Sequence, residues 1–143
     1  MRILLAIDGS SYSEAALQSV IAERRPADGP VRVVCVLQPV IATPPPQMAS
    51  GYAPELEEES IRARQLVEQA AERLGHAGFE VDGIVTKGDI RETILDLAEE
   101  WKADLIVMGS HGYGPVRRFL LGSVAEFVTR HAECSVEIVR AAA

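Results

Sequence analysis

The 143-residue sequence lacks several features that would assign it to common functional classes. It has no run close to the roughly eighteen apolar residues that a membrane-spanning helix requires. Its formal net charge of −7 has the wrong sign for neutralising nucleic-acid phosphates with Lys and Arg. The first apolar segment, Ile3–Ile7, is too short for a secretory signal and is followed at once by Asp8. We therefore expect a cytoplasmic protein that binds neither membranes nor nucleic acids.

Cysteine and lysine are also scarce. The two cysteines, Cys35 and Cys134, lie in apolar segments, where a thiol usually packs as a small hydrophobe. We therefore expect neither a disulfide nor a metal site. The two lysines, Lys87 and Lys102, do not follow a glycine loop of the Walker type, and the dinucleotide motif GxGxxG is absent. These two standard kinds of nucleotide site are excluded.

Short apolar runs alternate with amphipathic stretches, which is typical of a parallel sheet with crossover helices. The expected strands are Ile3–Ile7, Val31–Leu37, Phe79–Thr86, Asp104–Met108 and Cys134–Val139. The expected helices are Ser11–Arg25, Pro54 to about Ala77, Asp89–Trp101, and a last one from Phe119 or Gly122 to His131. The first and third of these helices open with capping-box spacing, at Ser11 with Glu14 and at Asp89 with Glu92. The proline-rich segment 38–53 is expected to be a long loop.

Strand composition predicts the order of the sheet. The first and fourth strands are almost unbroken apolar runs, as expected for strands buried on both faces. The other strands admit charged residues within their length, such as Arg32, Asp82 and Glu137. We therefore predict an α/β fold: one domain over residues 1–143, with a doubly wound open sheet of five parallel strands in the order 3-2-1-4-5 and helices on both faces. A ligand crevice is expected where the first and fourth strands end.

Both central strands lead into small polar loops, which the topology brings together. Asp8-Gly9-Ser10 follows the first strand, and Gly109-Ser110-His111-Gly112 follows the fourth and leads on to a helix. Glycine amides and a helix N-terminus are suited to binding phosphate. Asp8 is suited either to hydrogen bonds with a ribose hydroxyl or adenine amino group, or to a local Asx turn or helix cap. The loops predict a nucleotide site.

The glycines of the second loop have the spacing G-x2-G-x9-G-S, formed by Gly109, Gly112, Gly122 and Ser123. Together with the opening segment 3–10, this spacing resembles the ATP-binding branch of the universal stress protein family. Segments 33–36, 87–94 and 134–140 extend the resemblance over nearly the whole chain. The resemblance implies ATP lying across the first and fourth strands. It leaves open whether Mg or Mn accompanies the phosphates, and whether AMP or a cyclic nucleotide is preferred.

The resemblance also implies which residues form the site. Three of them, Ala6, Ile7 and Asp8, would flank the adenosine, and Val36 would pack on the base. The base, the ribose and the first phosphate would lie against Met108, Gly109 and Gly112. The rest of the phosphate chain would be covered by Gly122, Ser123 and Val124. His111 would belong to the same site as a residue that shapes the loop, not as a general base. Arg117 and Arg118 would either reach the outer phosphates or stay solvated.

The function implied is that of a regulatory ATP-binding stress-response protein that signals to an unknown protein partner. We expect no catalytic residue, since no nucleophile, positioned base or pair of metal-binding carboxylates accompanies the glycine loop. The alternative is a slow enzyme that hydrolyses ATP or transfers its adenylate from the same site. Adenylate transfer is disfavoured because the loop Ser-Gly-Gly-x-Asp-Ser of such enzymes is missing. A phospho-accepting receiver domain is rejected because Asp8 lacks an acidic neighbour.

The family often forms a homodimer through its last strand, and the same is expected here. Glu137 puts this expectation in doubt, because carboxylates opposed across a two-fold axis repel each other. Pairing then requires Arg140 or another cation to offset the charge.

Overall fold

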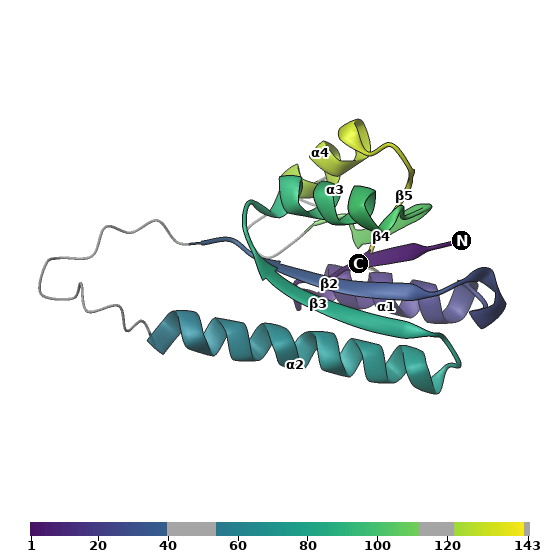
Figure 1. Cartoon of the computed structure of the whole chain (residues 1–143), viewed down its shortest axis with the longest axis horizontal. Coiled ribbons are helices and arrows are strands. Elements are labelled where there is room, and N and C mark those ends of the chain that lie inside the picture. The colour runs from purple at the N-terminus through teal and green to yellow at the C-terminus, as the bar shows by residue number, and fades with distance from the viewer. Residues whose placement is uncertain (40–53, 112–121, 142–143) are drawn as a thin grey trace, which may run out of the picture.

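Five parallel strands form one sheet in the order β3-β2-β1-β4-β5 (Figure 1). The computed structural model describes residues 1–39, 54–111 and 122–141. The strands are β1 (Ile3–Ala6), β2 (Val31–Leu37), β3 (Val81–Lys87), β4 (Leu105–Gly109) and β5 (Ser135–Val139). The helices are α1 (Ser11–Glu23), the short 3-10 helix η1 (Pro26–Asp28), α2 (Pro54–His76), α3 (Ile90–Trp101) and α4 (Ser123–His131). The predicted fold class and strand order are confirmed. Most of the predicted proline-rich loop lies outside the described residues.

The central position of β1 and β4 agrees with their composition. Every residue of both strands is buried, whereas the outer strands β3 and β5 are partly exposed along their length. β1 pairs with β2 on one side and with β4 on the other. A strand in this position contacts helices on both faces, so an unbroken apolar sequence is the pattern that it needs.

Each face of the sheet carries its own apolar core, because side chains alternate along a strand. Ile3 and Leu5 point to the face covered by α1 and α2. Leu4, Ala6 and Ile106 point to the face covered by α3 and α4. Figure 1 shows the two helix pairs on opposite sides of the sheet. The adjacent strands β1 and β4 therefore continue into helices on opposite faces of the sheet, α1 and α4. Their carboxyl ends lie where the chain turns away in opposite directions.

The helix caps differ in part from the prediction. Ser11 does not cap α1; it is the first helical residue, and Ser10 is the cap, with its Oγ accepting a hydrogen bond from the Ser13 N–H at 3.2 Å. The prediction of Asp89 as the cap of α3 is confirmed, because its Oδ1 accepts from the Glu92 N–H at 3.1 Å. In both cases the side chain satisfies a first-turn N–H that the helix itself leaves unbonded.

The boundaries of several elements also move. α1 ends at Glu23 and not at Arg25, because Arg24 is already extended, with φ −104° and ψ 157°, as is Arg25 before Pro26. β3 begins at Val81 and not at Phe79, whose N–H is bonded to the carbonyl of Leu74 in the turn after α2. The last helix begins after Gly122; the alternative start at Phe119 lies outside the described residues. Within the described ranges, none of the helices has both the length and the apolar character to cross a membrane.

Candidate functional site

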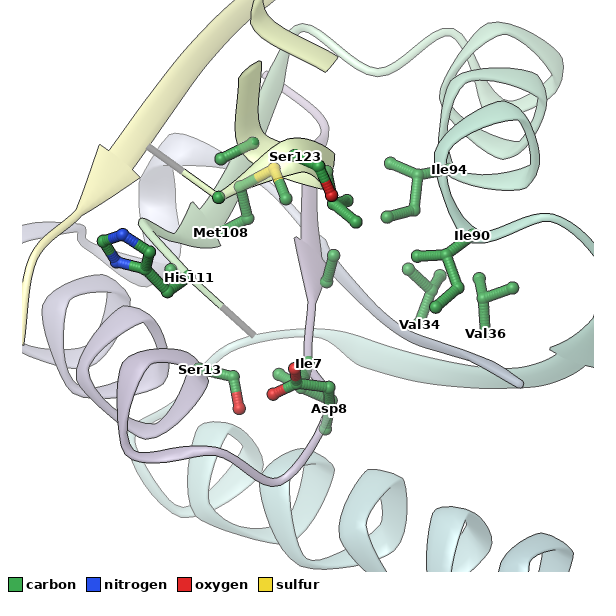
Figure 2. A pocket seen from close by; sticks show the side chains of 15 residues that line it. Ile7, Asp8, Ser13, Val34, Val36, Ile90, Ile94, Met108, His111 and Ser123 are labelled. Atoms are coloured by element: carbon green, nitrogen blue, oxygen red, sulfur yellow. The ribbon is translucent and has the colours of Figure 1, made fainter. Parts of the chain in front are cut away.

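A pocket of about 290 Å³ lies where β1 and β4 end, between the two helix layers (Figure 2). Its walls come from the ends of β1, β2 and β4, from the first turns of α1, α3 and α4, and from the loops beside them. The lining residues are Ala6, Ile7, Asp8, Ser13, Val34, Val36, Ile90, Ile94, Met108, Gly109, His111, Gly122, Ser123, Val124 and Ala125. The pocket is therefore at the strand boundary where the sequence predicts a ligand crevice.

The structure brings the predicted site residues together. Those within the described ranges all line this pocket: Ala6, Ile7, Asp8, Val36, Met108, Gly109, His111, Gly122, Ser123 and Val124. Gly112 lies outside the described residues, as do Arg117 and Arg118. Segments separated by about a hundred positions in the sequence thus share one cavity.

Five further lining residues were not predicted: Ser13, Val34, Ile90, Ile94 and Ala125. Val34 could have been found, since it lies two residues before Val36 and alternate residues of a strand face the same side. Ile90 and Ile94 are four residues apart in α3 and so share one helix face. The apolar stripe of α3 predicts that this face is buried, but not that it meets the end of β2, because that depends on the crossover.

The pocket has an apolar side and a polar side. Val34, Val36, Ile90 and Ile94 gather together on one side in Figure 2. Asp8 and Ser13 lie apart from this cluster, beside the first turn of α1. Such a division suits a ligand with a flat apolar ring at one end and, at the other, hydroxyl groups that can donate to the Asp8 carboxylate.

Asp8 has a structural part in the first loop. Its Oδ1 accepts a hydrogen bond from the Ser10 N–H at 2.9 Å, which is the arrangement of an Asx turn. Gly9 between them has a φ of +82°, a conformation that favours glycine. Because Asp8 also lines the pocket, the turn and the pocket wall share this residue.

Two glycines of the second loop stand where the chain approaches itself closely. A Cβ on Gly109 would lie 2.6 Å from the carbonyl carbon of Tyr12, so α1 starts directly against the end of β4. A Cβ on Gly122 would lie 3.1 Å from the Ser110 carbonyl oxygen, to which the Gly122 N–H donates at 2.8 Å. These contacts place the amino ends of α1 and α4 around one cavity.

The comparison with known proteins agrees with this arrangement. The model of the universal stress protein family matches residues 1–140. The chain belongs to the universal stress protein family. Its relatives include universal stress protein YxiE of Bacillus subtilis, which is 29% identical over 97% of this chain and 98% of the relative. Universal stress protein MJ0531 of Methanocaldococcus jannaschii is 33% identical over 97% of this chain and 81% of the relative.

Solved structures of universal stress proteins have the same fold. UspA from Lactobacillus plantarum superposes with a TM-score of 0.85 at 23% identity, covering 98% of this chain and 97% of that chain. A universal stress protein in complex with cAMP gives 0.74 at 23% identity, with 99% and 98% coverage. A family member from Arabidopsis thaliana with AMP bound gives 0.70 at 14% identity, with 100% and 93% coverage. At these identities the likeness establishes the shared fold.

The described residues of this universal stress protein contain no group of three or more His, Cys, Asp and Glu side chains arranged to hold a metal. Both cysteines are free thiols. Cys35 is buried in β2, and this burial, with a smaller contribution from the nearby Asp8 charge, raises the pKa of its thiol to about 11. Burial also raises the pKa of the less buried Cys134 thiol.

We expect Cys35 to resist thiol reagents in the native protein. At pH 8 a thiol with this pKa is ionised in roughly one molecule in a thousand, and the thiolate is the reactive form. The Cys134→Ser variant, which leaves Cys35 alone, is expected to react with Ellman's reagent only after denaturation. The matched Cys35→Ser variant, which leaves the half-buried Cys134, is expected to react faster while folded. Rapid labelling of Cys35 in the native protein would contradict this prediction.

Proposed function

We propose that this universal stress protein binds an adenine nucleotide, ATP, in the pocket at the ends of β1 and β4. The observation that carries the proposal is the composition of the pocket: an apolar wall from β2 and α3 faces a polar wall built from the glycine loops. Related proteins of the same fold are known in complex with cAMP and with AMP, which supports the adenine ring as the recognised group.

The apolar wall would hold the base, and the amino end of α4 would hold the phosphates. Val36 and Ile94 offer surfaces on which a purine can pack. The first-turn N–H groups of α4 have no acceptor within the helix and carry partial positive charge, which favours a phosphate. Ser123 and Val124 in the first turn of α4 line the pocket. The helix is therefore oriented with its anion-binding end toward the pocket.

The site favours binding over rapid turnover. Asp8 is the one carboxylate among the described lining residues, and its Oδ1 already accepts from Ser10. Phosphoryl transfer relies on metal-holding carboxylates and on a residue that positions the attacking group. We therefore propose a regulatory nucleotide-binding protein whose bound ATP biases its interaction with a protein partner.

The experiment begins with the ligand that accompanies the purified protein. Denaturation followed by chromatography and mass spectrometry is expected to release an adenine nucleotide. Calorimetric titration of the stripped protein should then give heat with ATP and a markedly weaker response with GTP. Incubation of substoichiometric protein with ATP and magnesium should form little ADP or AMP. If the stripped protein binds no adenine compound by heat or by thermal stabilisation, the proposal is wrong.

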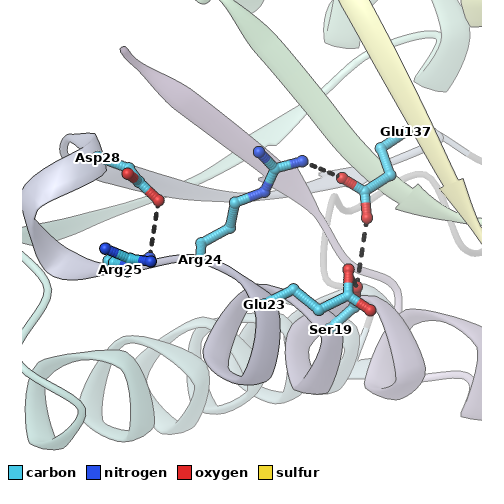
Figure 3. Close-up of polar contacts among 6 residues, drawn as sticks. All are labelled: Ser19, Glu23, Arg24, Arg25, Asp28 and Glu137. Atoms are coloured by element: carbon cyan, nitrogen blue, oxygen red, sulfur yellow. Dashed lines mark hydrogen bonds and ion pairs between the residues drawn. The ribbon is translucent and has the colours of Figure 1, made fainter.

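We further propose that the protein forms a homodimer through β5. This strand is the edge of the sheet within the described residues, so its outer backbone groups are available for pairing. The charge of Glu137 is offset within the chain: its Oε2 accepts from Arg24 Nη2 at 2.5 Å, and its Oε1 from Ser19 Oγ at 3.3 Å (Figure 3). Arg24, which lies beyond the end of α1, would supply the cation that pairing across β5 requires.

We expect Arg24→Met to lower the free energy of unfolding by about 1 kcal/mol, because it leaves the half-buried Glu137 carboxylate without its charged partner. It should also weaken the dimer, because the uncompensated carboxylates then repel across the interface. Urea titration and sedimentation equilibrium measure the two effects. The matched control is Arg25→Met, which removes the same charge at an exposed neighbour. Equal losses in both variants would show that the ion pair contributes nothing specific.

A further inference from the structure

The ends of β4, α1 and α4 meet at a buried junction. Ser110 and His111 follow β4 directly and are only 3% and 8% exposed. The Ser110 N–H donates to the carbonyl of Val139 at the end of β5, and the Ser110 carbonyl accepts from the Gly122 N–H at 2.8 Å. The residues on either side of segment 112–121 are therefore joined by a backbone hydrogen bond. Whatever fixes this junction also fixes the amino end of α4.

The His111 side chain contacts three parts of this junction. Its Nδ1 lies 3.0 Å from Ser110 Oγ, within hydrogen-bond distance. Its ring centroid lies 5.0 Å from that of Tyr12 in the first turn of α1, with the ring planes tilted by 54°. Its Cδ2 lies 3.7 Å from a Cβ built on Gly122, behind the His111 Cα and the Ser110 carbonyl oxygen, which both lie at 3.1 Å. The imidazole thus lies between Tyr12 in the first turn of α1 and Gly122 at the N-cap of α4.

We propose that His111 is a positioning residue for phosphate binding: its ring sets the spacing between α1 and α4 and so aims the first-turn amides of α4 into the pocket. This inference rests on the proposed nucleotide function and deepens it, because it assigns recognition of the phosphates to a residue that need not touch them. The base-binding wall comes from β2 and from Ile90 and Ile94 of α3, none of which belongs to the junction. Loss of the imidazole is therefore expected to affect the phosphate end of the ligand far more than the base.

The test compares ATP with adenosine on the His111→Ala variant. Calorimetric titration of stripped protein is expected to show ATP affinity reduced at least tenfold and adenosine affinity within twofold of the wild type. A general loss of structure would instead lower both affinities, or reduce the fraction of protein that binds. The selective change in the ratio of the two dissociation constants is the readout that a merely structural role does not produce.

Two more variants complete the experiment. His131→Ala removes an exposed imidazole from the opposite end of α4 and is expected to change neither affinity. If His111→Ala does not fold, His111→Gln is judged by the same ratio. Equal effects on ATP and adenosine, or no effect on either, overturn the role of His111 while leaving the nucleotide site intact. A wild-type protein that binds neither compound overturns the nucleotide function, and with it this inference.

Discussion

The Gly109→Ala substitution is expected to lower the free energy of unfolding by about 1 to 3 kcal/mol. Gly109 ends β4, and the added methyl carbon would lie 2.6 Å from the carbonyl carbon of Tyr12 and 2.7 Å from its oxygen. These are backbone atoms in the first turn of α1, so they cannot move aside as the tip of a flexible side chain can. Relief of the overlap requires α1 to shift away from the sheet, which loosens its packing. Urea unfolding followed by Trp101 fluorescence and far-UV circular dichroism measures the loss.

The control is the same chemical change at a glycine with room around it. Gly75 lies inside α2, and the nearest atom to a Cβ there is a methyl group of Val81 at 4.0 Å, an ordinary contact. Because alanine favours the helix over glycine, Gly75→Ala is expected to keep the stability or raise it by up to about 1 kcal/mol. If both variants lose the same free energy of unfolding, close approach is not the reason for glycine at position 109.

The order of the sheet could be predicted because the amino-acid composition of each strand reflects how deeply that strand is buried. β1 and β4 need apolar side chains on both faces, and their sequences show this without any neighbour being known. Arg32 on β2 and Asp82 on β3 mark strands with a partly solvated face, where the two side chains pair at 2.8 Å. Right-handed crossovers then leave few topologies that satisfy these constraints.

The contacts between the layers, some of which form the site, were harder to predict, because they depend on how the helices meet the sheet. Arg24 and Glu137 are 113 positions apart, and their ion pair exists because α1 packs beside β5. The approach of Tyr12 to Gly109 has the same origin. Ile90 adds a wall of the pocket from α3 for a similar reason. Glycine spacing located the polar loops, and family resemblance assigned them to a nucleotide, but neither fixes which face of α3 closes the cavity.

The prediction of Ser11 as the cap of α1 was wrong for a local reason. Ser10 and Ser11 are adjacent, and each has a side chain that can cap a helix. The capping-box pattern favours Ser11, because Glu14 follows it at the required distance. The Asx turn from Asp8 to Ser10 settles the competition, since it ends the loop at Ser10 and lets the helix start one residue earlier. A chain element that precedes the helix therefore decides its first residue.

The second large effect is expected at Gly122. We predict that Gly122→Val reduces the affinity for ATP at least a hundredfold, which corresponds to about 2.7 kcal/mol. Gly122 has a φ of −61°, which valine adopts without strain, so the change acts through space and not through the backbone. The new side chain would meet the Ser110 carbonyl and the His111 Cα, which lie 3.1 Å from the position of its Cβ. The N-cap of α4 would then have to move away from β4, which would turn the first-turn amides away from the proposed position of the phosphates.

A graded series separates this displacement from a general loss of structure. Gly122→Ala places only the methyl carbon in the narrow space, so its ATP affinity is expected to fall between those of the wild type and Gly122→Val. Gly75→Val adds the same side chain to α2, outside the pocket, and is expected to leave ATP affinity unchanged. Calorimetry gives the affinities, and urea unfolding shows that each variant is folded at the temperature of the titration. Wild-type affinity in a folded Gly122→Val protein would mean that the ligand is not held at the amino end of α4.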